Sequence, residues 1–154
     1  MEIKKLFEPI TINRLTIKNR IVMPSMGLAY STDYSFNDRY RDFYRERALG
    51  GVGLLTIGPV AIDRVGSAPF MPGLFDDSHV APLRKFIDQL HQETDARIAT
   101  QLLHMGRYTF SALTGVQPIA PSPIPSTLTH ETPREMTLED IETCLLYTSP
   151  SPRD

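Results

Sequence analysis

The feature that most constrains the fold is a continuous apolar run at residues 52–57, which is bounded by Gly50-Gly51 and by Gly58-Pro59. A run of this length without polar alternation is typical of a strand that is buried on both faces of a parallel sheet. Parallel strands are joined by crossovers, and helical patterns lie on both sides of this run. We therefore predict an α/β protein.

Two amphipathic helices flank this strand in the sequence. The first is predicted from about residue 37 to residue 49, and the second starts after Asp77-Ser78 and runs to about residue 93. Their apolar residues recur at helical spacing. These residues are Tyr40, Phe43, Tyr44 and Ala48 in the first helix, and Leu83, Phe86, Ile87 and Leu90 in the second.

Further strands are predicted before and after this pattern. Residues 10–12 and 15–17 flank Asn13-Arg14 as a hairpin, residues 20–23 form a run that Pro24 stops, and residues 98–103 follow the second helix. The order hairpin, β, α, β, α, β fits either a doubly wound sheet or part of a (β/α)8 barrel.

The carboxyl-terminal third is expected to be rich in loops. Prolines at 118, 121, 123, 125 and 133 exclude long helices and central strands there, and Thr137 is predicted to cap a last helix. The end of the chain turns into Ser-Pro repeats, which fit a natural disordered tail or non-native sequence after a broken reading frame; we favour the second. We expect one domain over 1–142 and a non-native or disordered tail over 143–154.

Composition excludes several classes of function. The net charge of the 154 residues is −2, so no basic field is available for nucleic acid or for an anionic membrane. The single cysteine, Cys144, supports neither a disulfide framework nor a metal-ligand cluster. The start lacks an apolar signal region and no stretch is long enough to span a bilayer, so a cytoplasmic location is expected.

Unusual residues stand where each predicted parallel strand ends. The three clusters are Pro24-Ser25-Met26-Gly27, Gly58-Pro59, and Gln101 with the following turn at 104–107. The carboxyl ends of parallel strands meet at one rim, where α/β folds bind ligands and where glycine lets a ligand approach the backbone. Ordinary turn chemistry is the alternative explanation for the glycines and prolines.

Gln101 carries the sharpest signal, because its amide lies among hydrophobic residues near the carboxyl end of the strand predicted at 98–103. A buried amide without partners costs roughly 1–3 kcal/mol. Neighbouring backbone could satisfy it, and so could the polar ring of a bound ligand.

Other candidate residues have simpler explanations. His104 and Arg107 could hold an anionic or carbonyl group, although a loop arginine more often pairs with a surface carboxylate. His91 is expected on a solvated helix face, and capping by Asp77 explains the Asp76-Asp77 pair better than acid–base chemistry does. The sequence contains no dinucleotide fingerprint, phosphate-binding loop or zinc spacing.

Four segments together resemble the amino-terminal part of the Old Yellow Enzyme family. They are Leu6-Phe7-Glu8-Pro9-Ile10, residues 15–23 (LTIKNRIVM), Gly50-Gly51-Val52-Gly53-Leu54 and residues 101–107 (QLLHMGR); Ala120-Pro121-Ser122 fits as well. The resemblance runs from about Leu6 to Glu142. It is greatest to the NADH:flavin oxidoreductase branch that includes 2,4-dienoyl-CoA reductases and 2-enoate reductases.

The resemblance implies the amino-terminal part of a (β/α)8 TIM barrel, closed at the bottom by the hairpin, with FMN at the carboxyl-end mouth. It assigns Pro24, Ser25 and Met26 to the loop along the flavin, Gly58 to backbone close to the ring, and Gln101 to its pyrimidine edge. NAD(P)H would reduce FMN, and the flavin would pass hydride to the activated C=C bond of a small alkene or enoyl substrate. Gly27 stands where relatives often carry the Cys or Thr that tunes the flavin.

The same resemblance implies that much of the site is absent from these 154 residues, since such a barrel takes about 250 residues. The substrate-holding His pair, the proton-donating Tyr, the phosphate site and, in some branches, an iron–sulfur segment would all lie later. The catalytic residues therefore stay unassigned, and we expect the chain to be an inactive fragment of an FMN-dependent oxidoreductase. The alternatives are a non-catalytic α/β interaction module and a flavin-free barrel such as a sugar-phosphate enzyme; the sequence leaves the oligomeric state open.

Overall fold

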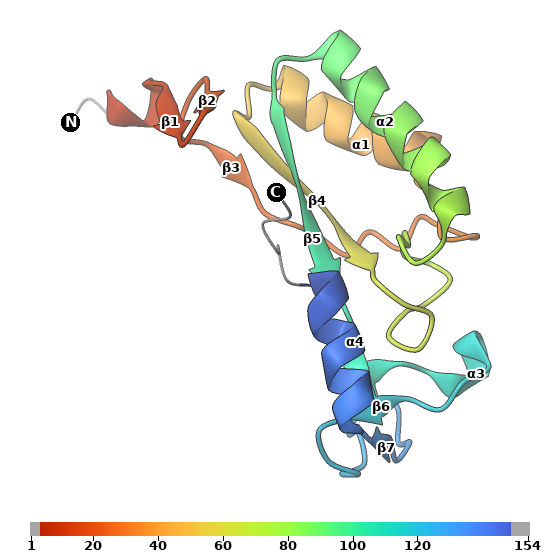
Figure 1. Ribbon diagram of the computed structural model, residues 1–154. Coiled ribbons are helices and arrows are strands. Elements are labelled where there is room, and N and C mark those ends of the chain that lie inside the picture. The colour runs from red at the N-terminus through yellow and green to blue at the C-terminus, as the bar shows by residue number, and fades with distance from the viewer. Residues whose placement is uncertain (1–3, 149–154) are drawn as a thin grey trace.

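A three-stranded parallel sheet lies at the centre of the molecule. The computed structural model describes residues 4–148, and in it the strand order is β3-β4-β5. The strands are β3 (Val22–Met23), β4 (Leu54–Ala61) and β5 (Arg97–Leu103). Helices α1 (Asp38–Leu49) and α2 (Val80–Glu93) both lie on one side of β4 and β5 (Figure 1). The predicted α/β class and the order of its elements are confirmed.

The main core lies between the sheet and these two helices. Leu55 and Ile57 of β4 are fully buried and contact the apolar stripes of both helices. Each successive strand residue points to the opposite face, so Leu54 and Thr56 point away from the helices and are only half-buried. The helix-side residues of this core are Tyr40, Tyr44 and Ala48 of α1, and Phe86 and Leu90 of α2.

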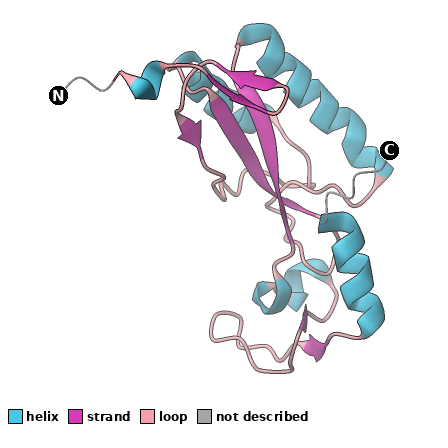
Figure 2. Ribbon diagram, turned by 60° about the vertical axis from the view of Figure 1, so that its left-hand side comes forward, coloured by secondary structure: helices cyan, strands magenta, loops and turns pink. Residues whose placement is uncertain are grey.

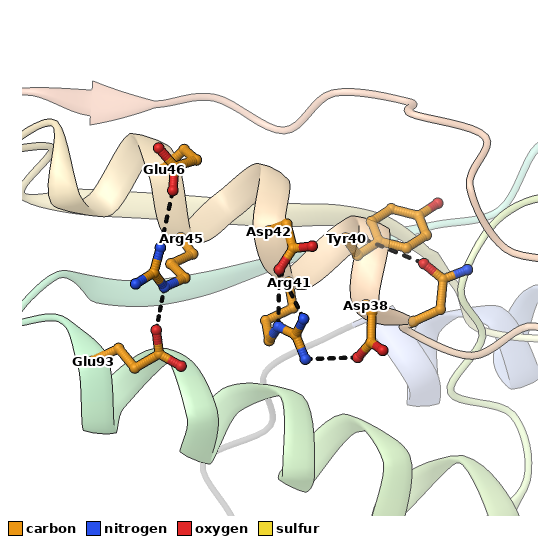
Figure 3. Close-up of polar contacts among 8 residues, drawn as sticks. Asp38, Tyr40, Arg41, Asp42, Arg45, Glu46 and Glu93 are labelled. Carbon is orange, nitrogen blue, oxygen red and sulfur yellow. Dashed lines mark hydrogen bonds and ion pairs between the residues drawn. The ribbon is translucent and has the colours of Figure 1, made fainter.

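Helix α1 begins where its sequence provides a cap. The side chain of Asn37 accepts a hydrogen bond from the backbone N–H of Tyr40 at 3.3 Å. On the outer face, Arg45 bridges Glu46 of its own helix and Glu93 of α2 (Figure 3). The two helices are therefore joined by an exposed ion pair as well as by the core.

The predicted hairpin is confirmed as β1 (Ile10–Ile12) paired antiparallel with β2 (Leu15–Ile17). Asn13 at the turn has φ 53°, a left-handed conformation that asparagine tolerates better than most residues do. Figure 1 shows the hairpin to the left of α1 and α2, and Figure 2 shows the same fold with this side turned forward. The hairpin is held to the start of β5 by a bond from Nε of Arg97 to the carbonyl of Thr16.

Two sequence predictions are wrong in detail. Strand β4 does not end at Gly58-Pro59 but continues to Ala61, with a register shift between Ile57 and Val60 in its pairing with β5. A strand can pass through proline at such an irregularity, because no ladder hydrogen bond is required there. The cap before α2 is Asp76 rather than Asp77: its carboxylate accepts from the N–H of Ser78 and starts the short 3-10 helix η2 (Asp77–His79).

The carboxyl-terminal part forms a small cluster beyond the end of β5 (Figure 1). It contains η3 (Gly106–Tyr108), α3 (Ser111–Thr114), the parallel pair β6 (Ile119–Ala120) and β7 (Arg134–Glu135), and α4 (Leu138–Thr148). Thr137 caps α4 as predicted, accepting from the N–H of Asp140 at 3.2 Å. The part of the expected tail at 149–154 lies outside the described residues. None of the helices in the described range is long and apolar enough to cross a membrane.

Candidate functional site at the carboxyl end of the sheet

The candidate site is the open face and rim of the sheet, on the side away from α1 and α2. Gln101 is exposed there, so the expectation that its amide is buried among core residues is wrong. Its side chain makes no hydrogen bond to the residues that the structure describes. The amide is exposed because no further strand or loop among residues 4–148 covers this face of β5.

Strand register relates three of the predicted site residues to one another. Ile57 pairs with Thr100, so Gly58 and Gln101 each come directly after a paired residue, and Met23, the last residue of β3, pairs with Leu55 one turn of the pleat earlier, with Met26 in the loop that follows. A β-carbon built on Gly58 would lie 3.0 Å from the carbonyl oxygen of Gln101, and Gly58 has φ +116°. A larger residue would be strained and crowded there, which explains glycine physically.

The loop after β3 supplies the other wall of the rim. Pro24 is exposed, and Met26 is 48% exposed although it is apolar. Between them, the hydroxyl of Ser25 is buried and has no hydrogen-bond partner among the described residues. A buried hydroxyl without a partner is uncommon in a native structure and indicates that a partner is provided by something else.

Two tyrosines of α1 reach from the core to the loops of this rim. The Tyr44 hydroxyl accepts from the N–H of Gly58 at 3.2 Å and donates to its carbonyl at 3.4 Å. The Tyr40 hydroxyl accepts from the N–H of Tyr30 at 3.3 Å and donates to the carbonyl of Phe70 at 3.5 Å. Burial raises the pKa of both phenols, so both keep the proton that they donate.

A small apolar pocket of about 120 Å³ opens beside Gly58. Of the five predicted cofactor-binding residues, only Gly58 lines it; Pro24, Ser25, Met26 and Gln101 do not. A groove of about 380 Å³ between α1 and α2 is larger, but no strand residue contributes to it. The smaller pocket is lined by Gly27, Leu28, Ala29, Tyr40, Gly58, Pro59, Phe70, Met71, Leu103 and Met105.

His104 lies close to other protein groups at both of its ring nitrogens. Its Nδ1 accepts from the N–H of Gly106 at 2.9 Å, so a neutral ring carries its proton on Nε2. Nε2 lies 3.3 Å from Oδ2 of Asp63, which follows β4. The backbone of Gly66 passes so close to the ring that a β-carbon there would lie 2.4 Å from it.

These contacts lower the pKa of Asp63. Burial of its carboxyl acts to raise the pKa, but the imidazole of His104 and the N–H groups of Gly66 and Val65 together outweigh it, so the pKa is lower than usual. The bond from Gly66 N–H to Oδ1 is 2.6 Å long. The group of Asp63, Gly66 and His104 thus ties the connection after β4 to the end of β5.

Sequence reasoning missed Tyr44, Asp63 and Gly66 as parts of this region. The signal for Tyr44 was present, because a tyrosine in a buried helical stripe needs a partner for its hydroxyl. Asp63 and Gly66 gave no comparable signal, since their partner His104 is distant in sequence. Arg107 forms no ion pair within residues 4–148, and His91 is exposed as expected.

Comparison with known proteins decides the family. The family model described as NADH:flavin oxidoreductase / NADH oxidase matches residues 5–147. The chain belongs to this family. The fold matches part of the barrel of Old Yellow Enzyme structures. The chain therefore corresponds to an amino-terminal part of the barrel in this FMN-dependent oxidoreductase family.

Named relatives support the same assignment. A metal reductase of Desulforamulus reducens is 47% identical over 136 residues, which cover 88% of this chain and 20% of that protein. An NADPH dehydrogenase of Geobacillus sp. is 41% identical over 143 residues, covering 89% of this chain and 40% of that protein. This member of the family thus spans between a fifth and two fifths of the length of these relatives.

Solved structures agree in fold. A 2-naphthoyl-CoA reductase, in complex with 2-naphthoyl-CoA, superposes with a TM-score of 0.85 at 26% identity, over 94% of this chain and 24% of that chain. The Old Yellow Enzyme homologue of Zymomonas mobilis gives 0.81 at 28% identity, over 92% of this chain and 42% of that chain. The (β/α)8 barrel reading of the sequence is thereby favoured over a doubly wound sheet.

Proposed function

We propose that this chain forms one wall of the FMN site in an oxidoreductase that transfers hydride from NAD(P)H to an activated C=C bond of a small substrate. The observation that carries the proposal is the rim itself. It combines an unpartnered buried hydroxyl at Ser25, a small apolar pocket beside Gly58, and an exposed, unpartnered amide at Gln101.

These residues fit a flavin in both shape and chemistry. The exposed Pro24 and Met26 offer apolar surface to a flat ring, and Gly58 lines the small apolar pocket beside them without adding a side chain to it. The Gln101 amide can donate and accept at once, which suits the alternating carbonyl and N–H groups of a pyrimidine edge. FMN, when bound, supplies the hydride-carrying chemistry, and the protein supplies orientation and polarity.

We propose further that the chain does not turn over by itself. The residues that the family resemblance assigns to substrate and phosphate binding are not matched within it, and neither is an iron–sulfur segment. Among residues 4–148, no group of three or more His, Cys, Asp or Glu side chains is placed to hold a metal ion. The interaction-module alternative has no specific observation in its favour, and membership of a flavin family sets the flavin-free barrel aside.

Amide chemical-shift mapping with FMN at millimolar concentration tests the proposed location. We expect shifts at residues 24–26, 58 and 101 and in their immediate neighbours, because these line the rim. Shifts that fall instead on the groove between α1 and α2 contradict the proposal. Titration with adenosine monophosphate is the control, since it has a phosphate and an aromatic base but no isoalloxazine ring.

A further inference from the structure

Tyr44 occupies an unusual position for a residue of an outer helix. It is fully buried, and its ring contacts Phe86 of α2 at a centroid distance of 6.1 Å. Its hydroxyl nevertheless reaches the rim of the sheet and contacts both polar backbone groups of Gly58. The side chain therefore spans the whole core, from α1 to the site.

The hydrogen bond between Gly58 and the Tyr44 hydroxyl takes the place of a ladder hydrogen bond that Gly58 does not form with β5. The ladder between β4 and β5 shifts register between Ile57 and Val60, so Gly58 is not paired in it. A buried backbone N–H without a partner is costly, and the Tyr44 hydroxyl satisfies it at 3.2 Å. The same hydroxyl donates to the Gly58 carbonyl, which makes the contact two-sided.

This arrangement decides what the Gly58-Pro59 segment of β4 can offer a ligand. The N–H of Gly58 is directed to Tyr44, and Pro59 has no N–H. Two successive residues at the rim thus present no free backbone donor. Hydrogen-bonded recognition there must come from side chains of neighbouring strands, such as Gln101.

We infer that Tyr44 is a positioning residue, whose hydroxyl fixes Gly58 so that the Gly58-Pro59 segment of β4 presents a flat, donor-free surface to the flavin ring. The inference rests on the proposed function for the identity of the ligand. In this arrangement, Gln101 provides the hydrogen bonds to the ring, and Gly58 provides backbone that carries neither a side chain nor a free N–H. Tyr44 itself does not touch the ligand.

Amide hydrogen exchange on the isotopically labelled chain, without ligand, is the first test. The Gly58 amide of the wild-type chain should exchange at least about tenfold more slowly than that of Gly27, whose amide forms no hydrogen bond in the described structure. Tyr44→Phe removes only the hydroxyl and should accelerate Gly58 exchange by about tenfold or more. Tyr108→Phe, at a residue that is 50% exposed, is the matched control and should change nothing.

Equal exchange rates for Gly58 and Gly27 in the wild-type chain overturn the inference, and this result does not depend on whether a variant folds. Unchanged Gly58 exchange in Tyr44→Phe overturns it as well.

FMN titration of the same proteins is the second test. Tyr44→Phe should raise the dissociation constant for FMN about five- to tenfold relative to Tyr108→Phe, because Gly58 is no longer held in place. Equal affinities in the two variants mean that the hydroxyl serves the fold alone and overturn the positioning role. Failure of FMN to affect the rim of the wild-type chain contradicts the proposed function instead, while the exchange result still decides whether Tyr44 holds Gly58.

Discussion

Asp63 makes the stability of the chain depend on pH. Its pKa in the folded chain is below the ordinary value, so the unfolded state takes up a proton first as the pH falls. The stabilisation is complete above the ordinary pKa of an aspartate and is lost as the pH falls through the lower folded pKa. The free energy of unfolding, measured in urea between about pH 6 and about pH 2, should therefore fall less steeply for Asp63→Asn than for the wild-type chain.

The control for this prediction is Asp88→Asn, at an exposed aspartate of α2. A pH profile of Asp63→Asn that matches both the wild type and Asp88→Asn contradicts the assignment of the effect to Asp63.

Gly66 should tolerate no side chain while His104 is present. A β-carbon at Gly66 would lie 2.4 Å from the imidazole, whereas one at Gly27 meets nothing within 4 Å. We expect Gly66→Ala to lower the free energy of unfolding by about 1–3 kcal/mol, and Gly27→Ala to have a much smaller effect. In a His104→Ala background the cost of Gly66→Ala should shrink, since the clashing ring is gone; a cost that stays the same places the clash elsewhere.

At the scale of elements, the core and not the surface ion pairs holds α1 and α2 together. Leu90 is 1% exposed, whereas the side chains of Arg45 and Glu93 are 37% and 41% exposed. We expect Leu90→Ala to cost about 2–5 kcal/mol of unfolding free energy. Glu93→Gln, which breaks the ion pair, should cost less than about 1 kcal/mol, and a larger loss in thermal or urea unfolding contradicts this ranking.

The elements were predictable from sequence because local signals agree with the fold. The Asn37 cap, the Gly50-Gly51 stop and the two helical stripes are properties of adjacent residues, and the structure follows them closely. The end of β4 was not predictable in this way. Gly58-Pro59 reads as a stop, but the hydroxyl of Tyr44, fourteen residues earlier in the chain, satisfies the glycine and lets the strand continue.

At the scale of the whole molecule, the open face of the sheet explains why the prediction of a buried Gln101 amide is wrong. Whether Gln101 is buried depends on what covers β5, and nothing in residues 4–148 does so. The sequence predicted parallel strands whose carboxyl ends lie on one side, and the parallel pairing of β3, β4 and β5 agrees with this, although β4 continues past Gly58-Pro59. The sequence could not show that Gln101 is exposed, because its exposure depends on packing against segments that are distant from β5 in the sequence.

The same geometry predicts how the purified chain treats flavins. With one wall of the proposed site, it should retain far less than one FMN per chain, as measured by flavin absorbance after gel filtration. Because the rim offers contacts to the ring and none to a phosphate, FMN and riboflavin should bind it with dissociation constants within about threefold of each other. A stoichiometric yellow protein, or a clear preference for FMN, contradicts this account.

The most direct test of the central claim is the affinity of the chain for FMN when Gln101 is changed to leucine. Gln92→Leu is the matched control, because Gln92 is an exposed glutamine on α2, away from the rim. Fluorescence-quenching titrations should give a dissociation constant about tenfold higher for Gln101→Leu than for the wild-type chain, because the hydrogen bonds of one amide are lost. The dissociation constant of Gln92→Leu should equal that of the wild-type chain. Equal affinities in the two variants would contradict the claim that the end of β5 holds the flavin.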